Sequence, residues 1–99
     1  MYTILTSKPG EYETELVDGL AQVESYDYYF YGHRKAVYTI AEIKADDIRV
    51  NVISADDPNI INRVPIKFFE TFNDLDGARS ELKQLITFGT LDTRLEKRS

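Results

Sequence analysis

The chain has 99 residues, of which 42% are apolar, and it carries a formal net charge of −5 at pH 7. This length holds one hydrophobic core, so we expect a single domain over residues 1–99. The acidic balance opposes general binding to a nucleic-acid backbone, and the absence of cysteine excludes disulfides, thiolate nucleophiles and thiolate-ligated metals.

The N-terminal segment is predicted to form a hairpin. Residues 2–6 are β-branched and apolar, and Pro9-Gly10 occupies the positions that a type II turn favours. Apolar and acidic residues then alternate over residues 11–16, which predicts a second strand with one acidic face. A helix over residues 11–24 fits the same spacing, and we prefer the hairpin because Gly19 interrupts the helical pattern.

The most unusual segment follows. Five of the six residues in 26–31 are aromatic, and Gly32 and three potentially cationic residues come directly after them. Aromatic residues favour strands and glycine favours the turn that ends one. We therefore predict a strand over residues 21–31, a tight loop near Gly32 and His33, and a further strand over residues 35–43.

A two-residue loop determines which side chains of the paired strands share a face. The first predicted face, which we expect to form the core, carries Tyr26, Tyr28, Phe30, Val37, Thr39, Ala41 and Ile43. The second carries Asp27, Tyr29, Tyr31, Arg34, Ala36, Tyr38, Ile40 and Glu42. Tyrosine and arginine are enriched at the centres of protein interfaces, so the second face is a candidate contact surface unless another part of the chain covers it.

The second half of the chain begins with further strand patterns. Residues 48–53 alternate apolar and polar side chains, which predicts a strand. Residues 60–64 are ambiguous because Pro65 discourages the middle of a sheet, and residues 66–72 fit another edge strand.

One amphipathic helix is predicted near the C-terminus. Asn73 is a suitable N-cap, with Asp76 three residues later, and Gly89 is a suitable C-terminal cap. The apolar stripe consists of Leu75, Ala78, Leu82, Leu85 and Ile86. The residues expected to face water are Arg79, Glu81 and Lys83. A last strand over residues 91–95 completes an α+β pattern, a curved antiparallel sheet of five to six short strands in hairpin order packed against this helix.

No arrangement in the sequence indicates catalysis, a cofactor or a metal site. His33 is the only histidine and falls at a hairpin tip, where we expect it to be solvated. The pairs Asp46-Asp47 and Asp56-Asp57 lack the spacing of an EF-hand calcium loop. The glycines do not cluster into a phosphate-binding loop.

The sequence favours a cytoplasmic, cofactor-free binding protein over an enzyme: an accessory or regulatory subunit that contacts a protein partner, a second copy of itself, or both. The candidate binding residues are Tyr29, Tyr31, His33, Arg34, Lys35 and Tyr38. One alternative is a small-molecule binder or minor enzyme with a tyrosine-lined pocket between sheet and helix. Another is a single-stranded nucleic-acid binder or an acidic mimic of nucleic acid, which the net charge disfavours. No membrane association is expected, because no apolar run reaches the length of a bilayer span.

Overall fold

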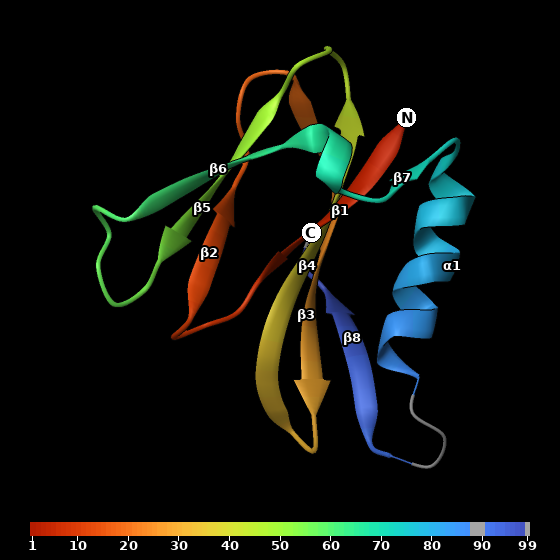
Figure 1. Cartoon of the computed structure of the whole chain (residues 1–99). Coiled ribbons are helices and arrows are strands. Elements are labelled where there is room, and N and C mark those ends of the chain that lie inside the picture. Colours follow the sequence, from red (N-terminus) through yellow and green to blue (C-terminus); the bar gives the residue numbers. More distant parts are fainter. Residues whose placement is uncertain (88–90, 99) are drawn as a thin grey trace.

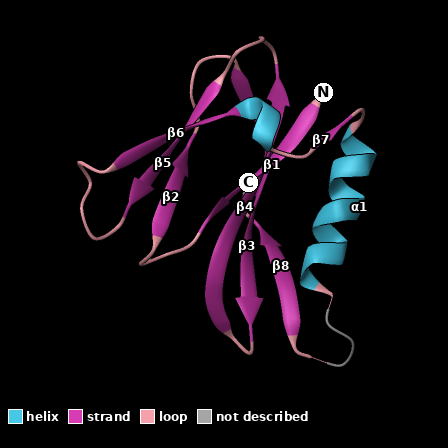
Figure 2. Ribbon diagram, in the orientation of Figure 1, coloured by secondary structure: helices cyan, strands magenta, loops and turns pink. Residues whose placement is uncertain are grey.

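The computed structural model describes residues 1–87 and 91–98 and consists of two antiparallel sheets and one α-helix (Figures 1 and 2). The strands are β1 (Tyr2–Ser7), β2 (Tyr12–Glu15), β3 (Leu20–Phe30), β4 (His33–Ile43), β5 (Arg49–Ser54), β6 (Ile61–Pro65), β7 (Thr71–Phe72) and β8 (Thr93–Lys97). The helices are the 3₁₀ turn η1 (Ile66–Phe68) and α1 (Leu75–Ile86). The predicted α+β class, with a C-terminal helix packed on an antiparallel sheet, is confirmed. Within the described residues, no helix combines the length and the apolar character needed to cross a bilayer.

The strands divide between a five-stranded sheet, here sheet A, and a three-stranded sheet, here sheet B. Sheet A has the order β7-β1-β4-β3-β8, and sheet B has the order β2-β5-β6. The predicted turn at Pro9-Gly10 is present, with Gly10 at a φ of 82°. After one bridge between Lys8 and Tyr12, the chain passes from sheet A to sheet B, where β2 pairs with β5. The helical alternative for residues 11–24 is therefore wrong, and the predicted strand is confirmed as β2.

The hydrophobic core has two parts, one on each face of sheet A. On one face, Ile40 packs against Ala78 and Leu82 of α1. On the other face, Leu5 and Ala41 pack against Val50 of sheet B. Figure 1 shows α1 on one side of β1 and β4, with β2, β5 and β6 on the other. Both faces of sheet A are thus covered over part of their length.

The helix boundary differs slightly from the prediction. The N-cap is Asp74 rather than Asn73, because the Asp74 carboxylate accepts a hydrogen bond from the amide of Gly77 at 2.7 Å. The predicted C-terminal cap, Gly89, lies outside the described residues. Residues 66–72 form η1 and the two-residue β7 instead of one edge strand, and β8 begins at Thr93, two residues later than predicted.

Candidate functional site

The loop of the β3–β4 hairpin contains an exposed tyrosine. Its loop consists of Tyr31 and Gly32, one residue earlier than predicted, with φ angles of 50° and 79°. Such a turn is normally built from asparagine, aspartate or glycine, because a side chain in the left-handed region costs about 1 kcal/mol. Tyr31 is nevertheless 52% exposed, and its ring packs edge-to-face with that of Phe30, with ring centroids 4.7 Å apart. An exposed tyrosine occupies a strained position that a smaller polar residue would fill at lower cost.

A β-bulge changes which residues share a face of the hairpin. Tyr29 pairs with Arg34, but Tyr28 pairs with Ala36, so Lys35 has no opposite residue. The extra residue reverses the parity between the two strands beyond this point. Tyr26 therefore lies opposite Tyr38. The predicted division into two faces is wrong beyond the bulge for this reason.

Tyr38 is consequently separated from the other candidate residues. It is half-buried on the side of sheet A that faces α1, with its ring centroid 5.9 Å from that of Tyr28. Burial raises the pKa of the Tyr38 hydroxyl above its ordinary value, and the neighbouring Tyr28 adds to the rise. Tyr38 contributes to the core between sheet and helix, so it is covered by its own chain.

The remaining candidate residues gather at the tip of the hairpin, together with one residue that the sequence did not single out. Tyr29 is half-buried, and the guanidinium carbon of Arg94 on β8 lies 4.5 Å from the centre of its ring. His33, Arg34 and Lys35 are exposed. We define the hairpin end as Tyr29, Tyr31, His33, Arg34, Lys35 and Arg94. It is an aromatic and cationic surface on a chain whose net charge is −5.

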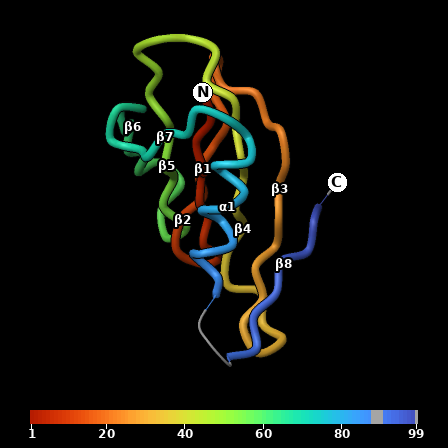
Figure 3. Tube along the Cα trace, turned by 90° about the vertical axis from the view of Figure 1, so that its right-hand side faces the viewer, coloured from red at the N-terminus to blue at the C-terminus, as the bar shows by residue number. Residues whose placement is uncertain are grey.

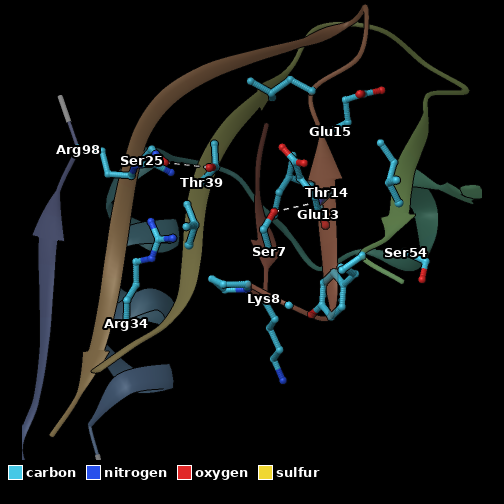
Figure 4. A pocket seen from close by; sticks show the side chains of 18 of the residues that line it. Ser7, Lys8, Glu13, Thr14, Glu15, Ser25, Arg34, Thr39, Ser54 and Arg98 are labelled. Carbon is cyan, nitrogen blue, oxygen red and sulfur yellow. Dashed lines mark hydrogen bonds between the residues drawn. The ribbon is translucent and has the colours of Figure 1, made fainter. Parts of the chain in front are cut away.

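A cleft of about 630 Å³ begins beside the hairpin end and runs between the two sheets (Figure 4). Its sheet A wall includes Arg34 and Arg98, and its floor carries the Ser25 and Thr39 hydroxyls, which hydrogen-bond each other at 3.0 Å. Among the described residues, Asp27 is the carboxylate within ion-pair distance of both arginines, 3.5 Å from Arg34 and 3.8 Å from Arg98. One carboxylate balances one guanidinium, so the described part of this wall has a net positive charge.

The opposite wall of the cleft is acidic. It includes Glu13 and Glu15 of β2, which diverges from β1 after the turn (Figure 4). The two strands stay connected there through Thr14, whose amide donates to the Ser7 hydroxyl at 2.8 Å and whose hydroxyl donates to the Thr6 carbonyl. The cleft thus lies where β2 of sheet B diverges from β1 of sheet A, beside the core formed by Leu5, Ala41 and Val50.

A buried carboxylate joins α1 to sheet A. Glu24 is 4% exposed, and it accepts hydrogen bonds from the Tyr26 hydroxyl and from Nε of Arg79, the latter at 3.0 Å. The bond from Arg79, and then that from Tyr26, lower the pKa of Glu24 below its ordinary value. Burial, and then the bond to Glu24, raise the pKa of Tyr26. The prediction that Arg79 faces water is wrong in part. Its side chain is 46% exposed, but its guanidinium forms an ion pair with the buried Glu24 carboxylate.

The candidates for metal binding stay apart. Asp46, Asp47 and Asp56 are exposed in loops, and the Asp57 carboxylate accepts the Asn59 amide at 3.0 Å. Within residues 1–87 and 91–98, no three acidic or histidine side chains gather in a group that could hold an ion.

Comparisons with known proteins assign no family: no family model, no curated protein and no solved structure matches the chain. The geometry of the hairpin end and of the cleft is therefore the basis for proposing a function.

Proposed function

We propose that the protein is a non-catalytic accessory or regulatory subunit that binds another protein through the hairpin end. The observation that carries the proposal is Tyr31, an exposed aromatic residue held at a φ of 50° in a two-residue turn. Strained backbone at an exposed position is typical of functional sites, because the fold gains nothing from it. Arginine and tyrosine are also the residues most enriched among those that dominate binding energy.

The charge of the hairpin end favours an acidic partner. The hairpin end carries three cations, Arg34, Lys35 and Arg94. Within residues 1–87 and 91–98, Asp27 pairs with Arg34 at 3.5 Å and Glu96 pairs with Arg94 at 3.3 Å, which leaves a net positive charge. Complementary charge accelerates association and selects among partners. We expect the partner to present carboxylates around an apolar recess that accepts the tyrosine ring, and we expect the contact to take place in the cytoplasm.

Partner capture from the native host tests this proposal. The test variants are Tyr31→Asn, which suits the turn but removes the ring, and Arg34→Glu combined with Lys35→Glu, which reverses the charge. The matched control is the other exposed aromatic–cation pair, Phe68 and Lys67 on η1, where Phe68 is 72% exposed and the ammonium lies 5.5 Å from the ring centre. We expect the specific partner to be lost from both test variants and retained by Phe68→Asn combined with Lys67→Glu. Equal capture by all of them, with the fold intact, would disprove the proposal.

The cleft supports a second candidate, a small anionic ligand bound against its sheet A wall, where Arg34 and Arg98 lie. This differs from the predicted tyrosine-lined pocket between sheet and helix, because Tyr12 is the tyrosine that lines the cleft. A smaller hollow of about 470 Å³ does lie between α1 and sheet A, and its tyrosine is Tyr26. A thermal-shift screen of anionic metabolites tests the cleft, and a shift that survives Arg98→Gln and Arg34→Gln would contradict binding there.

A further inference from the structure

In the part of the chain that the structure describes, β8, the outer strand of sheet A, has no neighbouring strand along one edge. β8 ends the order β7-β1-β4-β3-β8, and Figure 3 shows it on the outer side of β3. On its inner side, the amide of Arg98 donates to the Ser25 carbonyl at 2.8 Å, and the amide of Tyr31 donates to the Asp92 carbonyl at 2.9 Å. A strand with unpaired backbone groups along one side is a template for another strand.

These two bonds show which backbone groups of β8 face outward. In an antiparallel ladder the residues that bond to the neighbour alternate along the strand. The residues that bond inward, toward β3, are Asp92, Arg94, Glu96 and Arg98. The residues whose N–H and C=O face outward are Thr93, Leu95 and Lys97. Among residues 1–87 and 91–98, no hydrogen bond reaches these outward groups.

We propose that two copies of the chain associate antiparallel through their β8 strands, with Leu95 facing Leu95 of the second copy across a two-fold axis. This register also pairs Thr93 with Lys97 of the second copy. Every outward backbone group of both strands then finds a partner, and the two five-stranded sheets become one continuous sheet.

The side chains of β8 complement themselves in this register. Arg94 comes to lie directly opposite Glu96 of the second copy, and the same pair forms again across the two-fold axis. In a single chain these two side chains are exposed and 3.3 Å apart on the face of sheet A away from α1. Opposite charges placed directly across an antiparallel pair stabilise it, and like charges destabilise it.

The apolar face of β8 also fits a second copy. The Leu95 side chain is half-buried in the cluster between sheet A and α1. Because directly opposed residues of an antiparallel pair lie on the same face, the two α1 helices lie on the same side of the joined sheet. The two Leu95 side chains meet between them and extend the apolar layer from one copy to the other.

The other described edges do not offer this fit. In β6, the corresponding axis would place Arg63 against Arg63 of the second copy, and Pro65 has no N–H to donate. In β2, Tyr12 is already bonded to Lys8, and the Thr14 amide to Ser7. β7 spans only Thr71–Phe72.

Sedimentation velocity of the full chain over about 1 to 500 µM tests the proposal, because a dimer populates with concentration. We expect wild type to dimerise. Glu96→Arg and Arg94→Glu each place like charges opposite each other twice, so each should weaken the dimer by about ten- to a hundredfold. Both substitutions are at exposed side chains, so circular dichroism should show an unchanged fold.

The decisive arm mixes the two monomeric variants. At positions 94 and 96, the Arg94→Glu chain carries two acidic residues and the Glu96→Arg chain carries two basic ones. Each of the two 94–96 contacts between the different chains then joins opposite charges, so the mixture should form a heterodimer. The ion pair within one chain cannot produce this result, because neither variant has it. Any of three results would overturn the proposal. Wild type could stay monomeric throughout the concentration range, the single variants could dimerise like wild type, or the mixed variants could form no heterodimer.

Discussion

Replacing Glu24 with glutamine removes a buried charge from the contact between α1 and sheet A while it preserves the size of the side chain. The Glu24 carboxylate is 4% exposed and accepts hydrogen bonds from Arg79 and Tyr26. A hydrogen bond to a charged group contributes about 1.5–3 kcal/mol, and the partial exposure of Arg79 favours the lower end. We therefore expect Glu24→Gln to lower the free energy of unfolding by about 1.5–2 kcal/mol at pH 7.

The same variant should behave differently in acid. The pKa of Glu24 is lowered in the folded state from an ordinary value of 4.5, so the unfolded chain binds its proton at a higher pH than the folded chain does. The stabilisation from the charge is complete above pH 4.5 and is lost as the pH falls through the lower folded pKa. The stability difference between wild type and Glu24→Gln should shrink below pH 4.5.

Urea denaturation from pH 7 down to acid measures this difference. For a denaturation slope of about 1–2 kcal/mol/M, the midpoint of the variant should fall by about 1 M at pH 7. Glu42→Gln is the matched control, since the Glu42–Lys44 pair is solvent-exposed at 3.8 Å and should contribute at most about 0.5 kcal/mol. A deficit of the same size at neutral and acid pH would refute the reasoning, because the carboxylate charge would then not be the cause.

Three further substitutions probe the core, a turn and the hairpin. Leu82→Ala removes a side chain that is 2% exposed and should cost about 2–5 kcal/mol, seen as a fall in Tm of about 10 °C or more. Gly19→Ala should destabilise more than Gly10→Ala in thermal melts: both glycines have positive φ, but only at Gly19 would the new Cβ lie 3.0 Å from Ile48. Tyr31→Asn should change the free energy of unfolding by less than about 1 kcal/mol in urea titration, because relief of the left-handed backbone offsets the lost contact with Phe30; a loss well above this would make Tyr31 a structural residue.

The parts of the fold that the sequence predicted are those with local causes. Pro9-Gly10 specifies its turn through its own φ angles, and alternation of apolar and polar side chains identifies β2 and β5. The apolar stripe of α1 is likewise a local pattern. Asn73 and Asp74 can both cap a helix, so only the observed bond to Gly77 distinguishes them.

The parts that the sequence did not predict depend on distant contacts. No glycine at Lys35 indicates a bulge in the sequence, yet the bulge there places Tyr38 on the helix side of the sheet. Glu24 occupies a strand and Arg79 a helix 55 residues away, so nothing local pairs them. An acidic residue predicted inside a strand, facing a helix with an arginine beside its apolar stripe, is the signal that could have suggested that ion pair.

Photo-crosslinking tests whether the hairpin end is a contact surface. A photoreactive phenylalanine analogue placed at Tyr31 should crosslink to one specific protein in the native host. The same analogue at Phe68, an aromatic position that is more exposed (72% against 52%), should not. Adding Arg34→Glu and Lys35→Glu to the Tyr31 probe should abolish the crosslink. A probe at Tyr31 that captures nothing beyond what the Phe68 probe captures would contradict the account.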